Sequence, residues 1–136
     1  MDKYAVPEEL VVRNDIGYIV INTRAFFEKS SLTKQRQLLA YAFRDFGKNT
    51  ETIRRIGEYL PRRLCEARSG LEEAVKKYSD EYTAVRLHPE LSGKEKKEAE
   101  AHNRSLMKNV KHCKAVCRKF TSIISFYETL KNKNEE

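Results

Sequence analysis

Six cations in one stretch of the sequence have the type and spacing to do chemistry. Residues 101–127, AHNRSLMKNVKHCKAVCRKFTSIISFY, contain six lysines and arginines and no aspartate or glutamate. On an α-helix, where successive residues are about 100° apart, four of the six fall within about 80° of one another and two flank them. We call these six residues the basic ridge: Arg104, Lys108, Lys111, Lys114, Arg118 and Lys119, of which Lys114 and Lys119 are the flanking pair. From Arg104 to Arg118 the ridge extends over about 21 Å, at about 1.5 Å per residue.

The basic ridge matches the chemistry of a phosphate backbone. Neutralising several phosphates releases counterions, so we expect binding that weakens strongly with salt. Lysine recognises charge rather than base edges, so the binding should be largely independent of sequence. The ridge does not distinguish RNA from DNA as the ligand. Two other interpretations remain: the ridge contacts an acidic protein partner, or it is a solvated face that pairs with acids of a neighbouring helix. The candidate acids are Glu72, Glu73, Asp80 and Glu81.

A second basic stretch, TIRRIGEYLPRRLCEARSG (residues 52–70), has five arginines in nineteen positions. Here acids alternate with arginines at i, i+4 spacing along one helix face: Arg54, Glu58, Arg62 and Glu66, with a further pair of Glu51 and Arg55. Each exposed pair contributes only a few tenths of a kcal/mol, but together the pairs neutralise the surface. This pattern favours a salt-bridged outer face, with auxiliary phosphate contacts from Arg55, Arg62 and Arg63. The alternative is a helix-turn-helix motif, with Arg54 and Arg55 beginning the recognition helix after the turn GKN.

The sequence lacks the spacings of metal and catalytic sites. Cys113 and Cys117 are four residues apart beside His112, but both cysteines fall on the apolar face of their helix, which predicts buried free thiols. There is no glycine-rich phosphate loop, nucleophile elbow or pair of carboxylates in an apolar setting. We therefore expect no metal, no cofactor and no enzyme activity.

The elements that must position these residues are mainly helical. Residues 1–22 predict a small β-hairpin or extended arm, with Gly17 in its turn, and residues 23–47 predict short helices capped by Asn22 or Thr23 and by Thr33. Apolar residues at spacings of three and four predict two long antiparallel helices over 51–88 and 94–131, the second capped by Ser92. Pro61 points away from the apolar stripe, so it either kinks the first long helix or divides it. The expected fold is one mainly α domain, residues 1–136: a helical bundle built on a long antiparallel helical hairpin.

Composition narrows the classes of function. Lys and Arg outnumber Asp and Glu by 27 to 20, a net charge of +7, and residues 93–136 alone carry +5, from eleven basic and six acidic residues. This balance favours acidic partners. No segment approaches the about 18 apolar residues of a membrane span, and MDKYAVPEEL has no apolar signal-peptide core. We therefore expect a cytoplasmic protein with reduced cysteines and no membrane contact; long helices often self-associate, so a homodimer is one option.

One stretch is similar to a known class of protein. CRKFTSIISFYETLK (residues 117–131), with the plan of a small basic helical protein, resembles the small helical subunits of RNA-guided CRISPR effector complexes. The likeness covers about fifteen residues of helix pattern, contains no diagnostic motif and assigns no residue a role. The sequence thus predicts a non-catalytic nucleic-acid-binding protein. The alternatives are a protein–protein adaptor or inhibitor, or a subunit of a larger ribonucleoprotein complex.

Overall fold

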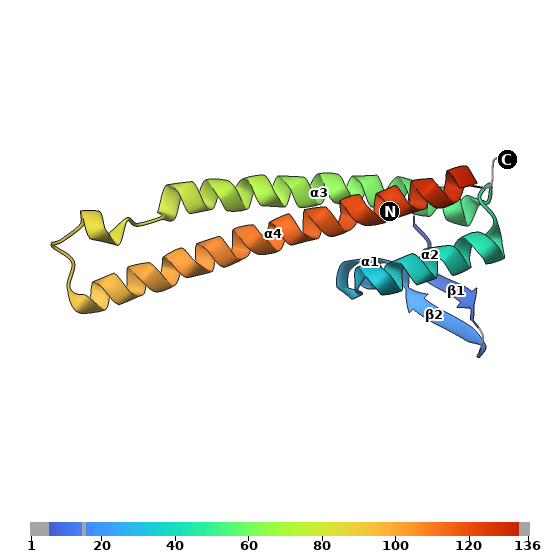
Figure 1. The fold of residues 1–136 in the computed structure, drawn as a ribbon, viewed down its shortest axis with the longest axis horizontal. Coiled ribbons are helices and arrows are strands. Elements are labelled where there is room, and N and C mark those ends of the chain that lie inside the picture. Colours follow the sequence, from blue (N-terminus) through green and yellow to red (C-terminus); the bar gives the residue numbers. More distant parts are fainter. Residues whose placement is uncertain (1–5, 15, 134–136) are drawn as a thin grey trace. The chain divides into compact units, whose positions relative to one another are not determined.

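The computed structural model describes residues 6–14 and 16–133, so the first five residues of the predicted arm, and Asp15, lie outside the described residues. The elements in chain order are β1 (Glu9–Arg13), β2 (Tyr18–Asn22), α1 (Thr23–Lys29), α2 (Leu32–Phe46), α3 (Glu51–Glu81), the 3-10 helix η1 (Val85–Leu87) and α4 (Gly93–Lys133). The predicted mainly α fold, with two long helices that pack together and a small N-terminal β-hairpin, is confirmed (Figure 1). None of the described helices is long and apolar enough to cross a membrane.

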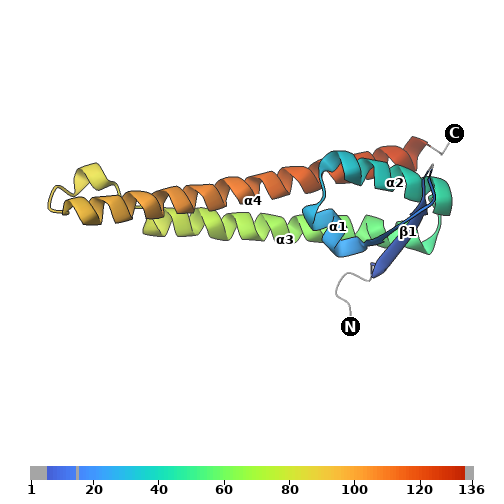
Figure 2. The same ribbon diagram turned by 90° about the horizontal axis from the view of Figure 1, so that it is seen from below.

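The chain divides into two units that share the long helices. Unit 1 comprises Met1–Leu64 and Lys119–Glu136, and unit 2 comprises Cys65–Arg118. In unit 1 the first part of α3 packs against the last part of α4, and in unit 2 the last part of α3 faces the first part of α4 (Figures 1 and 2). The two helices are therefore antiparallel within each unit, as predicted.

Side-chain contacts with the backbone explain where the predicted helix bounds and caps were wrong. The first long helix ends at Glu81 rather than near His88, because the Asn103 side chain binds the backbone of Thr83: it accepts from Thr83 N–H at 2.9 Å and donates to Thr83 O at 2.7 Å. Pro61 lies inside α3 without dividing it. The N-cap of α2 is Ser31, not Thr33, since the Ser31 hydroxyl accepts from the amide of Lys34.

Two predicted caps are confirmed. Asn22 caps α1 by accepting from the amide of Ala25 at 3.0 Å. Ser92 and Glu95 form a reciprocal capping box at the start of α4: the Glu95 amide donates to the Ser92 hydroxyl at 3.1 Å, and the Ser92 amide donates to the Glu95 carboxylate at 3.2 Å. These short-range contacts satisfy backbone N–H groups that the first turn of a helix leaves without partners.

The hairpin of β1 and β2 packs on the helices of unit 1 through one face. The strands pair antiparallel, with Leu10 opposite Ile21 and Val12 opposite Ile19. Leu10 and Val12 are buried, and the side chain of Asn14 accepts the amides of Ile16 and Gly17, both at 2.9 Å, to close the turn. Gly17 has the predicted positive φ. A two-stranded sheet is marginally stable alone, so the hairpin depends on this packing.

Most of the described core belongs to unit 1. Sixteen of the twenty buried apolar side chains lie there, which indicates that unit 1 supplies most of the hydrophobic stabilisation. Two aromatic pairs tie its helices together: Phe27 of α1 with Tyr59 of α3, and Phe43 of α2 with Tyr127 of α4. Burying a large apolar side chain contributes about 1.5–3 kcal/mol, so these contacts are a substantial part of the fold's stability.

Tyr127 meets α3 at a glycine. Its hydroxyl donates to the carbonyl of Ile53 at 3.0 Å and lies where a Cβ at position 57 would stand, so the contact requires Gly57. Burial raises the pKa of the Tyr127 phenol, which therefore stays protonated and able to donate at neutral pH. Glycine in a helix interior costs about 1 kcal/mol relative to alanine, and here the close approach of α3 and α4 offsets that cost.

The C-terminus of α1 is held by two side chains from elsewhere in unit 1. The ammonium group of Lys119 donates to the carbonyls of Glu28 at 2.9 Å and Ser30 at 3.4 Å. The buried side chain of Gln35 donates to the carbonyls of Phe27 at 2.9 Å and Ser30 at 3.1 Å. A short helix leaves its last carbonyls without intrahelical partners, and a cation there also complements the helix dipole. Lys119 is thus a structural link between α4 and α1.

Unit 2 has a narrower core. Its buried apolar side chains are Ala67, Ala74, Leu106 and Val110. Because α3 and α4 cover each other only along one stripe, residues at the margin of that stripe stay in contact with solvent: Val75 is 46% exposed, and Cys113 and Cys117 are half-buried rather than buried as predicted. Cys65 is exposed.

We predict that Gly57→Ala destabilises the protein by about 1–3 kcal/mol, because the new methyl group overlaps the Tyr127 hydroxyl in a packed interface. Gly70→Ala is the matched control: it also lies inside α3, but a Cβ there meets nothing within 4 Å, so helix propensity should stabilise the protein by about 0.5–1 kcal/mol. Urea unfolding of both variants measures the two shifts. Shifts of the same sign would contradict the role given to Gly57.

We also predict that Lys119→Met lowers the free energy of unfolding by about 1–2 kcal/mol, because two carbonyls of α1 lose a charged donor. Lys114→Met is the control, since Lys114 is exposed on the same helix and makes no hydrogen bond to a described residue; its effect should stay within about 0.5 kcal/mol. Thermal unfolding by circular dichroism compares them. Equal losses of stability in the two variants would show that the Lys119 contact does not contribute to the free energy of unfolding.

Candidate nucleic-acid interface

Five of the six basic ridge residues lie in unit 2, on one uninterrupted helix. α4 runs from Gly93 to Lys133 without a break, so helical periodicity holds along the whole ridge. The five residues are all exposed: Arg104, Lys108, Lys111, Lys114 and Arg118. We call these five the unit 2 ridge. Lys119, the sixth, belongs to unit 1.

The apolar side of α4 positions the unit 2 ridge. Leu106 and Val110 are buried, with relative exposures of 5% and 6%. At about 100° per residue, Leu106 and Val110 each lie about 160° from Lys108, which stands near the middle of the ridge. Packing of the apolar stripe therefore keeps the cations in solvent. This is the arrangement predicted from the helical spacing.

The unit 2 ridge has no acidic partner among the residues that the structure describes. Of the acids that could have neutralised it, Glu81 contacts His102 at 3.0 Å, and Asp80 pairs with Lys76 at 3.5 Å. No ion pair joins Glu72 or Glu73, as far as the chain is described, to any of the five cations. Within the described chain, no ion pair therefore neutralises any of the five cations.

Three of the five cations surround a shallow hollow. Arg104, Lys108 and Lys111 line an open depression of about 310 Å³, together with the side chain of Met107. Three cations on consecutive turns can give charge-assisted hydrogen bonds to phosphate oxygens, and guanidinium can bind two oxygens at once. Met107, a flexible apolar side chain that the sequence pattern did not single out, is the fourth residue that lines this hollow.

The remaining predicted site residues lie in unit 1 and interact within the chain. Arg63 makes two hydrogen bonds with the carboxylate of Glu28, and its guanidinium lies 5.0 Å from the centre of the Phe120 ring. Arg55 pairs with Glu51 at 3.1 Å. Arg62 also has a partner within the chain. With Lys119 bound to α1, these four residues have internal uses that compete with phosphate.

The predicted salt-bridged face of α3 is confirmed in part. Arg54 pairs with Glu58 and also with Glu51, and hydrogen bonds from Arg54 and Arg55 lower the pKa of Glu51, which therefore stays ionised at neutral pH. Arg54 and Arg55 are the residues that would begin a recognition helix. Their guanidinium groups are bound by acids of their own helix, which disfavours the helix-turn-helix alternative.

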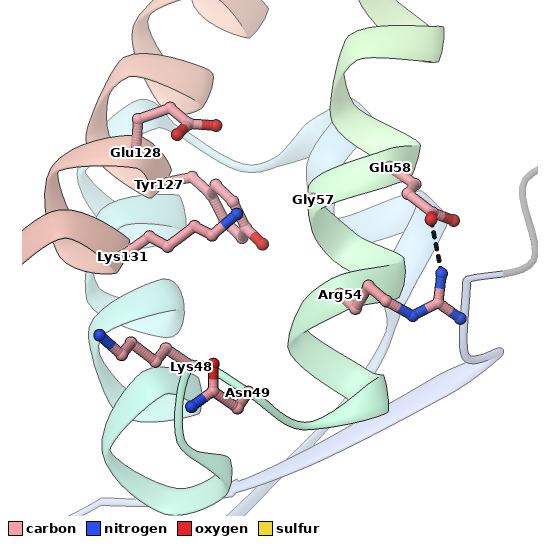
Figure 3. A pocket seen from close by; sticks show the side chains of 8 residues that line it. All are labelled: Lys48, Asn49, Arg54, Gly57, Glu58, Tyr127, Glu128 and Lys131. Carbon is pink, nitrogen blue, oxygen red and sulfur yellow. Dashed lines mark hydrogen bonds and ion pairs between the residues drawn. The ribbon is translucent and has the colours of Figure 1, made fainter. Parts of the chain in front are cut away.

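A larger hollow in unit 1, of about 410 Å³, lies where α3 meets α4 (Figure 3). It is lined by Lys48, Asn49, Arg54, Gly57, Glu58, Tyr127, Glu128 and Lys131. Figure 3 shows the Tyr127 ring extending from α4 beside Gly57, and Arg54 joined to Glu58. The Tyr127 hydroxyl and the Arg54 guanidinium thus already have partners, so they are not arranged as a catalytic pair. Over residues 6–14 and 16–133, no three His, Cys, Asp or Glu residues are grouped to hold a metal.

Comparison with protein-family models, curated proteins and solved structures finds no match to this chain.

Proposed function

We propose that this chain is a non-catalytic nucleic-acid-binding protein that contacts the phosphates of RNA or DNA through the unit 2 ridge. The observation that carries the proposal is the set of five exposed cations along one side of α4 with no acidic partner among the described residues. Unpaired cations at this density raise the local concentration of polyanions and steer their association. The arginines of α3 largely pair with acids of the same chain, so we expect them to contribute less to phosphate binding.

The proposed contacts are mainly electrostatic. If all five cations meet phosphates, the logarithm of affinity should fall with the logarithm of salt concentration with a slope of about −4.5 on duplex DNA and about −3.5 on a single strand. Three of the five are lysines, which recognise charge rather than base edges, so affinity should depend little on sequence. Arg104 and Arg118 add forked donors suited to phosphate oxygens.

An assembly role is compatible with the same chemistry. A subunit of a ribonucleoprotein complex, including one of the RNA-guided type, would bind nucleic acid weakly alone and firmly beside its partner proteins. An adaptor or inhibitor that docks on an acidic protein would show no affinity for nucleic acid even at low salt. Titration of the isolated protein with generic RNA and DNA separates these alternatives.

We predict that the triple variant Lys108→Glu, Lys111→Glu, Lys114→Glu loses at least a hundredfold in affinity for a fluorescent duplex or single strand of about twenty nucleotides at low salt. The salt slope should also become shallower, by about three on the duplex and by about two on the single strand, because each lysine that met a phosphate contributed about 0.9 or about 0.7 to it. Fluorescence anisotropy over a series of salt concentrations measures both quantities.

The matched control is Lys77→Glu, Lys94→Glu, Lys97→Glu. These three lysines are exposed in unit 2, and reversing them changes the net charge by the same amount while leaving the unit 2 ridge intact. The control should keep affinity within about fivefold of the original protein. Equal losses in the two triple variants would mean that net charge alone drives binding, and the ridge would not be the site.

A further inference from the structure

The outer edge of β2 has unpaired backbone groups. Asn14 N–H donates to Gly17 O at 2.8 Å, and Thr23 N–H donates to Glu8 O at 3.1 Å. In an antiparallel ladder the hydrogen-bonded pairs alternate with non-hydrogen-bonded pairs, so the register turns the backbone groups of Tyr18 and Val20 away from β1. Neither residue's N–H has a partner among the described residues. Figure 1 shows β2 as the strand of the hairpin farther from α2.

The outer edge of β1, by contrast, is blocked at its Arg13 end. Arg13 N–H donates to the carboxylate of Asp45 at 2.7 Å, and Arg13 O accepts from the guanidinium of Arg44. The Arg13 amide is the main cause that lowers the pKa of Asp45, followed by Arg44, so this carboxylate is ionised at neutral pH. Two side chains of α2 therefore occupy the backbone groups of Arg13, where a strand added to β1 would have to pair. The edge of β2 has no such contact among the described residues, so it is the edge better suited to extension.

The edge of β2 also lacks the features that usually protect an exposed strand. Its sequence, YIVIN, contains no charge and no proline. Tyr18 is 75% exposed and Val20 is 61% exposed, so the outward side chains add apolar surface to the open backbone. Proteins normally protect such edges with lysine, proline, a bulge or a covering segment. An open edge of β-branched and aromatic residues is suited to pairing with an added strand.

A hollow of about 240 Å³ lies beside this edge, on the inner face of the hairpin. It is lined by Ile19, Phe26, Lys34, Gln37, Leu38 and Tyr41. Successive side chains of a strand alternate between the two faces of a sheet. A third strand paired with β2 would therefore place every second side chain on the face that carries Ile19. The mostly apolar lining suits an apolar side chain.

Lys34 gives the hollow a charge preference. It is exposed and makes no ion pair with a residue that the structure describes. A carboxylate on the same face of an added strand would meet this single cation. A second copy of β2 could not supply that group, because YIVIN has no acidic residue. The chemistry of the site therefore favours a different protein over self-association.

We propose that β2 accepts, as a third strand, an extended segment of a partner protein that carries an apolar side chain for the hollow and, two residues away on the same face, an aspartate or glutamate for Lys34. The backbone groups of Tyr18 and Val20 supply pairing that is independent of sequence, and the hollow with Lys34 supplies the preference. The site lies entirely in unit 1 and uses none of the unit 2 ridge residues, so it adds a protein-binding function to the one proposed above.

Selection from a phage-displayed library of random peptides, each about twelve residues long, tests the proposal on the full chain. The expected result is enrichment of peptides with alternating apolar residues and an acidic residue two positions from one of them. Selection on Lys34→Glu should replace that acidic residue with lysine or arginine. A folding defect could not produce such an exchange of charge. Failure to enrich any peptide family, or the same family on both proteins, would overturn the proposal.

Variants of the strand edge test the mode of binding. Val20→Pro removes one outward N–H and should lower the affinity for the best selected peptide at least tenfold. Val20→Thr keeps that N–H, so its affinity should stay within about threefold of the original.

Light scattering during size-exclusion chromatography then tests self-association. A dimer that Val20→Pro converts to a monomer would mean that a second copy occupies the edge, which contradicts the proposal. We expect the peptide affinity to be unchanged in the triple variant Lys108→Glu, Lys111→Glu, Lys114→Glu. A lower affinity in that variant would mean that the peptide binds the unit 2 ridge and would contradict the proposal.

Discussion

The constraint on which the structure depends is the single apolar stripe of α4, which α3 covers in both units. In unit 2, Leu106 and Val110 occupy that stripe, and in unit 1 Phe120 and Tyr127 do so. The Tyr127 hydroxyl reaches the backbone of α3 because position 57 has no Cβ. In unit 2, once the stripe is packed, the side of α4 that carries the five ridge cations is exposed to solvent. A helix with this pattern can carry a series of cations there without burying any of them.

The basic residues of this chain fall into two physical groups. Arg54, Arg55 and Arg63 lie on α3 among acids at helical spacing or opposite Glu28, and Coulomb attraction at such short range gives each an internal partner. Residues 101–127 contain no acid, so every ridge cation except Arg104 lacks an acid at i, i+3 or i, i+4. Glu100 lies four residues before Arg104, but no ion pair joins the two in the described chain. Exposed ion pairs are individually weak, so a phosphate could displace one. The unpaired group needs no such exchange, and for this reason it is the better candidate for binding a polyanion.

Sequence patterns predicted the elements and the unit 2 ridge well, because both follow from helical periodicity. They failed where a contact joins residues distant in the sequence. Lys119 has the charge and spacing of a ridge residue, yet its ammonium group binds carbonyls about ninety residues earlier, a contact that no local pattern shows. The end of α3 at Glu81 likewise depends on Asn103, twenty residues beyond Thr83. The burial of Cys113 and Cys117 was overestimated because a helical wheel cannot tell how many neighbours cover a stripe.

The hairpin shows the same dependence on distant contacts, because contacts from α2 make its two edges different. Arg44 and Asp45 block the Arg13 end of β1, and no side chain of the described residues blocks the outer edge of β2 in this way. Most positions of β2 could not have carried a protecting charge: Ile19 faces the helices, and Asn22 must cap α1. Only Tyr18 and Val20 were free to do so, and both are apolar and exposed. The fold therefore permits a protected edge, and it is the choice of these two side chains that leaves β2 open to another strand.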